Sequence, residues 1–175
     1  MLDRHAAEGL TDLFALAAIR LYLFTGARLS EILTLRWANV DLERRVILLD
    51  DSKTGAKPIF LSSAAVDTLA TLPRVSGNKY VIVGAKDGRH LVNIQKPWRW
   101  IRKEAGVDGT RIHDLRHTFA SYAGAQGASL LMIGQLLGHT RSETTKRYAH
   151  LVAEPLQNVV DKVGTHLIGG PPDVR

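Results

Sequence analysis

The stretch RIHDLRHTFASY (residues 111–122) contains two histidines four positions apart, with an aspartate and an arginine between them. On a helix, this spacing puts His113 and His117 on one side, as in the zinc-protease motif H-E-x-x-H. That motif needs a glutamate base within the helix and a third ligand beyond it. Asp114 is a shorter acid and no such continuation follows. A zinc site therefore accounts poorly for this stretch, and Arg116 needs another explanation.

Helical periodicity gives the same stretch an apolar side and a polar side. Leu115, Phe119 and Tyr122 form the stripe that is expected to face the core. His113 and Arg116 fall together outside that stripe. The pattern predicts a helix from His113 onward with a polar side that carries His113 and Arg116.

The N-terminal part of the chain predicts two helices joined by a tight bend. Residues 10–24 (LTDLFALAAIRLYLF) are apolar on nearly all sides, which is typical of a helix buried in a core. Gly26 can end this helix in a left-handed conformation, and Ser30 followed by Glu31 can begin the next one. Arg28 is therefore expected in the bend between two hydrophobic helices.

Three short runs have the composition of strands. RVILL (45–49) and PIFL (58–61) flank a segment that contains a glycine, and together they predict a β-hairpin. YVIVG (80–84) predicts a further short strand. With the helices, these runs predict one mainly α domain with a small antiparallel β-sheet, an α+β fold.

Two further helices are predicted between the hairpin and residue 111. SSAAVDTLATL (62–72) is a helix that Pro73 ends, and residues 94–105 place apolar side chains at helical spacing. The second of these helices also carries a basic stripe of Arg99, Arg102 and Lys103. Such a stripe is either a solvated face or a contact surface for an anionic partner.

The C-terminal part predicts three more helical segments. In residues 129–137, Ser129 is a cap, Leu130, Ile133 and Leu137 form the buried stripe, and Gly138 ends the helix. TRSE (140–143) fits a capping box, so TTKRYAH (144–150) is expected to be helical. A third, amphipathic segment follows Pro155, with apolar side chains at Leu156, Val159, Val160 and Val163.

Composition narrows the class of protein. The 175 residues carry 23 Lys and Arg against 17 Asp and Glu, for a net charge of +6, which favours an anionic partner without identifying it. The absence of cysteine excludes disulfides, thiolate catalysis and cysteine-rich zinc sites. No signal peptide is visible, and the most apolar run, 13–24, is too short to span a bilayer. We expect a soluble intracellular protein, with no membrane partner.

Five stretches occur in one order: TGARLSEIL (25–33), SKTGAKPIFLS (52–62), HDLRHTFAS (113–121), LGH (137–139) and TTKRYAHL (144–151). Together they closely resemble the catalytic domain of tyrosine recombinases, the phage-integrase family, from about residue 10 to residue 151. The resemblance implies the fold of that domain. We expect a single catalytic domain over residues 1–168, without an N-terminal core-binding domain, and a disordered tail at 169–175.

Carried over residue by residue, the resemblance implies a six-residue active site: Arg28, Lys53, His113, Arg116, His139 and Tyr148. It implies that Tyr148 is the nucleophile and that the two arginines stabilise charge on the phosphate. Lys53 is then the candidate general acid, His113 the candidate base or a proton-relay partner for Tyr148, and His139 a hydrogen-bond donor to phosphate. Glu31 and His117 are implied as supporting residues, the second through packing and hydrogen bonding.

The implied activity is metal-independent cleavage and rejoining of double-stranded DNA through a 3′-phosphotyrosyl intermediate, with no cofactor. The implied partners are double-stranded DNA and, in a full-length recombinase, other protomers of a synaptic tetramer. Two relatives with other roles stay open: an inactive DNA-binding regulator and a relaxing type IB topoisomerase. A metal nuclease is disfavoured, because Asp50 and Asp51 lie in a predicted turn and no other carboxylate cluster stands out.

Overall fold

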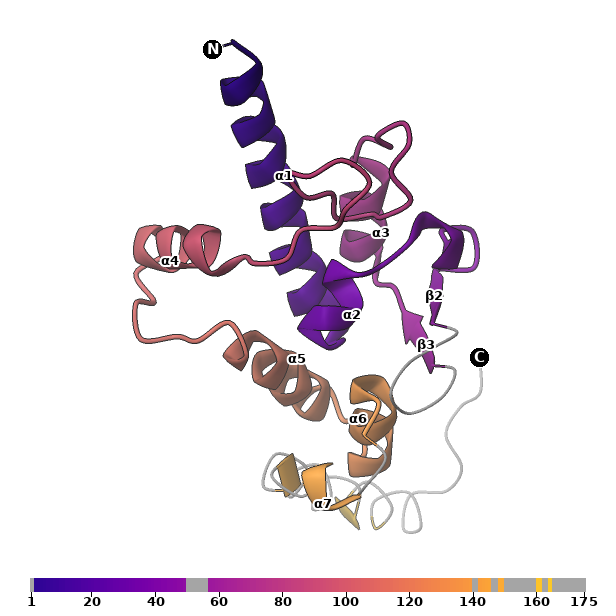
Figure 1. Ribbon diagram of the computed structural model, residues 1–175. Coiled ribbons are helices and arrows are strands. Elements are labelled where there is room, and N and C mark those ends of the chain that lie inside the picture. The colour runs from indigo at the N-terminus through magenta and orange to yellow at the C-terminus, as the bar shows by residue number, and fades with distance from the viewer. Residues whose placement is uncertain are drawn as a thin grey trace.

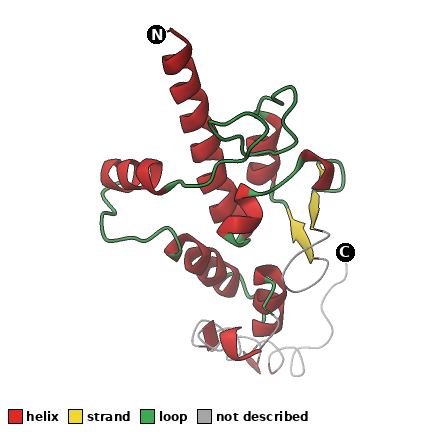
Figure 2. Ribbon diagram, in the orientation of Figure 1, coloured by secondary structure: helices red, strands yellow, loops and turns green. Residues whose placement is uncertain are grey.

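A computed structural model describes residues 2–49, 57–139, 142–145, 148–149, 160–161 and 164. Helices make up most of this part of the chain, and a three-stranded antiparallel sheet of order β1-β2-β3 lies at one edge (Figure 1, Figure 2). The predicted fold class, mainly α with a small antiparallel sheet, is confirmed.

The first helix, α1 (Leu2–Thr25), forms the centre of the main hydrophobic core. Phe14, Ala18 and Leu21 are fully buried, as are side chains on other sides of the helix. Helices α3 (Ser63–Ala70), α4 (Gln95–Glu104) and α5 (Asp114–Ala125) pack against it. The predicted core helix is confirmed, but one of its sides, with Leu13 and Leu16, is exposed. The predicted start at residue 10 is wrong, since residues 2–9 lack an apolar pattern but include good helix formers.

A tight bend joins α1 to α2 (Leu29–Leu33), as the sequence predicts. Gly26 takes a left-handed conformation with φ of 60°, and the extended Arg28 is the N-cap residue of α2. The helix begins at Leu29, one residue before the predicted Ser30. The bend thereby fixes the backbone of Arg28 at the end of a buried helix.

Gly26 is expected to be the least replaceable residue of this bend. A Cβ there would lie 2.3 Å from Cδ1 of Phe119, on α5, and the left-handed conformation disfavours any L side chain. Gly26→Ala should therefore lower the free energy of unfolding by about 3 kcal/mol, combining backbone strain with overpacking. Urea unfolding measures the effect.

Gly88→Ala is the matched control, because Gly88 has φ of 65° but nothing within 4 Å of the added Cβ. This variant should show only the backbone strain, about 1 kcal/mol. Equal losses in the two variants would contradict the close approach of α5 to the bend.

The sheet follows α2 and a 3-10 turn, η1 (Trp37–Asn39). It consists of β1 (Val40–Asp41), β2 (Val46–Leu49) and β3 (Lys57–Phe60), all antiparallel. The pair Ile47 and Ile59 is buried against the core, while Leu48 and Phe60 are exposed, which is the alternation of a sheet with one covered face. The predicted hairpin is confirmed; its turn, with Asp50, Asp51 and Lys53, lies outside the described residues.

The predicted strand at residues 80–84 is wrong. This segment makes isolated bridges, Arg36 with Tyr80 and Val83 with His90, instead of joining the sheet. Val81 and Ile82 are nevertheless fully buried. The apolar run therefore reflects burial in the core, and a short apolar run cannot distinguish a strand from another buried segment.

Helices α5, α6 (Leu130–Leu137) and α7 (Ser142–Thr145) form the other part of the fold, with a smaller core of its own. The predicted caps of α6 are confirmed, because the Ser129 side chain accepts from the backbone N–H of Met132 and Gly138 is left-handed with φ of 65°. Thr140 and Arg141 of the predicted capping box lie outside the described residues, as do Leu156, Val159 and Val163 of the tail.

The apolar stripe predicted for α5 is wrong at one end. Tyr122 is 69% exposed, and the buried positions of the helix are Arg116, Ala120 and Gly124. The small residues Ala120 and Gly124 let the neighbouring helices approach closely, whereas the larger side chains flank this line. As a result, Arg116 points into the protein instead of toward solvent.

Candidate functional site

A cavity of about 460 Å³ lies where α1, the α1–α2 bend, α5 and the ends of α6 and α7 meet. Its lining is polar and mostly cationic or aromatic. The lining residues are Tyr22, Arg28, Leu29, Ser30, His113, Arg116, His117, His139, Thr144 and Tyr148. Five of the six residues predicted for the active site are among them, and the sixth, Lys53, lies outside the described residues.

Arg28 is held by hydrogen bonds to two segments, α2 and the end of α6. Its Nη1 donates to Oε1 of Glu31 at 2.8 Å, and the other oxygen of Glu31 accepts from the Arg28 backbone N–H at 2.8 Å. Its Nη2 donates to the carbonyl of Gly138 at 2.9 Å, beyond the last turn of α6. Glu31 therefore orients the guanidinium, as its predicted supporting position requires, and Arg28 ties the bend to α6.

Arg116 is buried, with 6% of its surface exposed. Its Nη1 donates to the carbonyl of Gly26, and its Nη2 donates to the carbonyl of Leu137 at 2.7 Å. Burial lowers the pKa of this guanidinium from its ordinary value, and the positive charge of Arg28 lowers it further. The two guanidiniums thus lie near each other, held by consecutive carbonyls at the C-terminal end of α6, where the helix dipole favours cations.

Two histidines, one at the start of α5 and one after the end of α6, line the cavity. His113 is the N-cap residue of α5, and its Nδ1 lies 3.4 Å from the hydroxyl of Tyr22 on α1. His139 follows the left-handed Gly138, and its Nδ1 lies 3.0 Å from Oγ1 of Thr145. His139 therefore links the end of α6 to α7, the helix that precedes Tyr148.

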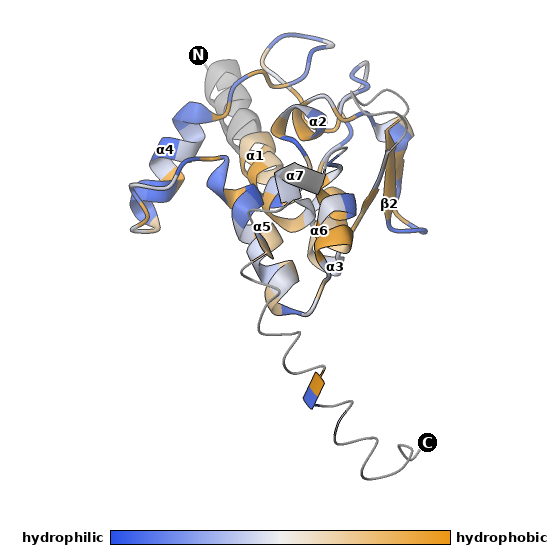
Figure 3. Cartoon of the chain, turned by 90° about the horizontal axis from the view of Figure 1, so that it is seen from below, coloured by the Kyte–Doolittle hydropathy of each residue, from blue (hydrophilic) through white to orange (hydrophobic). Residues whose placement is uncertain are grey.

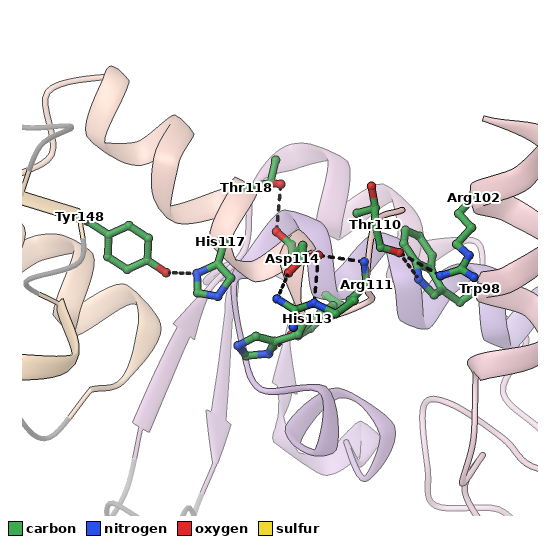
Figure 4. Close-up of polar contacts among 10 residues, drawn as sticks. Trp98, Arg102, Thr110, Arg111, His113, Asp114, His117, Thr118 and Tyr148 are labelled. Carbon is green, nitrogen blue, oxygen red and sulfur yellow. Dashed lines mark hydrogen bonds and ion pairs between the residues drawn. The ribbon is translucent and has the colours of Figure 1, made fainter. Parts of the chain in front are cut away.

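Tyr148 is 5% exposed and packs in the smaller core against Ala120, Ile133 and Leu137. Its hydroxyl lies 2.7 Å from Nδ1 of His117, and Figure 4 shows the phenol directed at that ring. The rings of His113 and His117 meet edge to face, with centroids 4.9 Å apart. The phenol oxygen is therefore held at the cavity by a histidine on α5.

Sequence reasoning assigned Tyr22 only to a buried helix and did not connect it with the site. Tyr22 is 1% exposed, and its pKa is raised from the ordinary 10.0, chiefly by burial; the charge of Arg116 acts in the opposite direction. The only signal in the sequence is the hydroxyl of Tyr22 within the apolar run that is expected to be buried. Its position beside His113 follows from the packing of α1 on α5, which no local pattern reveals.

The raised pKa of Tyr22 predicts a loss of stability at alkaline pH. Above pH 10 the unfolded chain releases the phenol proton while the folded chain retains it, so stability falls as pH rises toward the folded pKa. The free energy of unfolding should fall by about 1 kcal/mol per pH unit more steeply than in Tyr22→Phe. Urea unfolding between pH 9 and 11 measures both slopes. Parallel slopes would contradict the raised pKa of the buried Tyr22 hydroxyl.

The basic stripe predicted at residues 99–103 lies on α4, outside the cavity. Arg99 and Lys103 are exposed, and Figure 3 shows this helix as hydrophilic over much of its surface. Arg102 is half-buried and its Nη1 donates to the carbonyl of Thr110 at 3.3 Å, which ties α4 to the segment before α5. Two of the three side chains are therefore available to a partner.

Within the described residues, no group of three histidine or acidic side chains is arranged to hold a metal ion. In the same part of the chain, no helix combines the length and the apolar character needed to cross a membrane. The HDLRH stretch thus contributes its arginine and its histidines to a cavity lined by side chains from five other places in the chain.

Comparison with known proteins agrees with this arrangement. The model of the phage integrase family matches residues 4–154, which include every cavity-lining residue. The chain belongs to the phage integrase family. Tyrosine recombinase XerA of Saccharolobus solfataricus is 32% identical over 145 residues, a match that covers 80% of this chain and 47% of the relative.

Two solved structures place the fold within the same family. A XerA recombinase matches with a TM-score of 0.65 and 26% identity, over 89% of this chain and 60% of that chain. The catalytic domain of bacteriophage HP1 integrase matches with a TM-score of 0.61 and 28% identity, over 83% of this chain and 79% of that domain. The chain spans about half the length of the curated phage integrase relatives that it matches.

Proposed function

We propose that residues 1–168 are the catalytic domain of a site-specific DNA recombinase. It cleaves and rejoins double-stranded DNA by transesterification, through a 3′-phosphotyrosyl intermediate. The observation that carries this proposal is that the guanidiniums of Arg28 and Arg116 and the phenol of Tyr148 line one cavity. Membership of the phage integrase family and the likeness to the HP1 catalytic domain support it.

The two arginines fit a DNA phosphodiester. Attack on phosphorus concentrates negative charge on the non-bridging oxygens, and a guanidinium offers a planar pair of donors to such oxygens. A guanidinium has five N–H groups; Arg28 and Arg116 each use two of them in the hydrogen bonds described above. The remaining donors can bind phosphate, and each is worth about 3 kcal/mol in the transition state.

The proton transfers require further groups. A tyrosine hydroxyl is almost fully protonated at neutral pH, so attack by Tyr148 needs a proton acceptor. The leaving 5′ oxygen needs a donor, a role that we assign to Lys53. We assign to His139, which lines the cavity, the role of a hydrogen-bond donor to a phosphoryl oxygen. General acid–base steps of this kind each contribute about a hundred- to ten-thousand-fold.

The phosphotyrosyl ester explains recombination as opposed to hydrolysis. The ester at Tyr148 conserves the energy of the phosphodiester, so a 5′-hydroxyl from another strand can reverse the step without ATP. We further propose that the partners are double-stranded DNA and other protomers in a synaptic tetramer of the full-length protein. The place of action is then the cytoplasm, at the nucleoid. The intact cationic cavity disfavours an inactive regulator, and the tyrosine recombinase relatives disfavour a topoisomerase.

Trapping of the covalent intermediate tests the proposal. A pool of duplexes with randomised sequence on both sides of a nick is incubated with the protein in EDTA. The short fragment released on cleavage diffuses away, and adducts that survive denaturation are recovered and amplified. We expect enrichment of one sequence family that forms an EDTA-resistant adduct. No adduct after repeated rounds would overturn the proposed activity.

The basic stripe on α4 predicts the salt dependence of DNA binding. Each phosphate contact contributes a slope of about −0.9 to log K against log salt concentration. Replacement of the exposed Arg99 and Lys103 by alanine should therefore make the slope shallower by about 1.8. Fluorescence anisotropy with the enriched duplex measures it. Lys86→Ala with Arg89→Ala, which removes two exposed charges elsewhere, should leave the slope unchanged; an equal effect would contradict a local contact.

A further inference from the structure

The histidine in contact with the proposed nucleophile is not the one that the sequence assigns as its base. Nδ1 of His117 lies 2.7 Å from the Tyr148 hydroxyl, within the range of a strong O–H···N hydrogen bond. Nδ1 of His113 faces the hydroxyl of Tyr22 instead, at 3.4 Å. Figure 4 shows the phenol of Tyr148 directed at His117.

The position of His117 follows from helix geometry. It comes directly after Arg116 on α5, so its side chain leaves the helix about 100° away from the buried guanidinium. His117 accordingly faces Tyr148 in the segment that follows α7, while Arg116 points into the core. One turn of α5 thereby presents a charge-stabilising group and a titratable group to the same cavity.

We propose that His117 is the catalytic base that accepts the proton of Tyr148, an inference that rests on the proposed function. In the Nε2–H tautomer, Nδ1 carries no proton and accepts the hydrogen bond that the phenol donates. As the Tyr148 oxygen bonds to phosphorus, its proton moves to Nδ1, the bond from phosphorus to the 5′ oxygen breaks, and that oxygen takes a proton from Lys53. Strand transfer reverses each movement, and the imidazolium returns its proton to the phenol.

Charged and titratable groups surround His117 on several sides. Asp114, on the same helix, exerts a charge interaction with it, and the ring of His113 is packed against its edge. The other titratable or charged groups that line the cavity are Tyr22 from α1, Arg28 from the bend, Arg116 on α5, His139 after α6 and Tyr148 after α7. The carboxylate attracts a positive charge on the His117 ring, whereas the guanidiniums repel it.

The pH dependence of single-turnover adduct formation tests this assignment, with the enriched nicked duplex as the probe. In the wild type, the rate should rise between about pH 5 and 8, where imidazoles titrate, and then level off. His117→Gln retains a hydrogen-bond acceptor but cannot take the proton. Its rate at pH 7 should fall by about 10²- to 10⁴-fold and should keep rising toward pH 10 as the phenol ionises.

Two comparisons separate a base from a group that only positions the phenol. His113→Gln should retain the rise between pH 5 and 8. A fluorinated tyrosine of lower pKa at position 148 should restore much of the lost rate of His117→Gln, because it loses its proton without a base. His90→Gln, which removes a histidine distant in sequence from the site, should behave as the wild type. If His117→Gln keeps the wild-type pH profile, or His113→Gln loses it, the assignment is overturned.

A measurement on the unmodified active site covers the case in which His117→Gln does not fold. Nitrogen-15 NMR at pH 8 should show Nδ1 of His117 without a proton, and Tyr148→Phe should shift that signal. A protonated Nδ1 would overturn the proposal. Absence of any wild-type adduct would instead reject the proposed activity, so the two failures are distinguishable.

Discussion

Tyr148→Phe is expected to abolish formation of the covalent DNA adduct while the protein stays folded. A phenyl ring has no oxygen to form the ester, so the rate should fall by at least about 10⁴-fold, the order seen when a catalytic nucleophile is removed. The ring still fills its place against Ala120, Ile133 and Leu137. The hydrogen bond to His117 is lost, which should cost about 1 kcal/mol of stability. Denaturing gels measure the adduct, and urea unfolding measures the stability.

Tyr122→Phe is the matched control for this experiment. Tyr122 is 69% exposed on α5 and does not line the cavity, so removal of its hydroxyl should leave adduct formation unchanged. An adduct that persists in Tyr148→Phe, or that disappears in Tyr122→Phe, would show that a different residue attacks the phosphate.

Arg116→Lys is expected to damage both catalysis and the fold. A lysine ammonium cannot donate to the carbonyls of Gly26 and Leu137 together and still offer a planar pair of donors to phosphate. Adduct formation should fall by about 10²- to 10³-fold, as for the loss of one transition-state donor. One buried carbonyl is left without its partner, at a cost of about 2 kcal/mol. Single-turnover rates and urea unfolding measure the two effects.

Arg111→Lys provides the comparison. Arg111 is exposed at the start of the same stretch, where it pairs with Asp114 at 3.1 Å, and an exposed ion pair contributes about 0–1 kcal/mol. This variant should therefore be active and stable. Equal effects of the two substitutions would contradict the role of a buried, doubly hydrogen-bonded guanidinium.

Helix ends that depend on residues adjacent in sequence can be predicted from the sequence alone. The caps of α6 at Ser129 and Gly138, and the left-handed Gly26 that ends α1, are all confirmed. The strand expected at residues 80–84 is absent because its bridging partners, Arg36 and His90, are set by tertiary packing. Capping and turn chemistry depend on local backbone, whereas strand pairing depends on where a distant segment lies.

The candidate active site likewise combines residues that the motifs predict with contacts that only the tertiary packing sets. The family motifs predict five active-site residues, and the supporting His117, whose side chains the structure brings together around the cavity. They do not predict that Arg116 is buried, because its partners are carbonyls of Gly26 and Leu137, 90 and 21 positions away. Nor do they assign Tyr22 to the site or show that His117 contacts Tyr148. Those contacts arise where α1, α5 and the segment after α7 converge.

Mass spectrometry of the trapped adduct tests the central claim most directly. The adduct formed on the enriched duplex in EDTA is digested with a nuclease and a protease, and the nucleotide-bearing peptide is sequenced. The account predicts a nucleotide attached through its 3′-phosphate to Tyr148. A nucleotide on any other residue, or one attached through a 5′-phosphate, would contradict it.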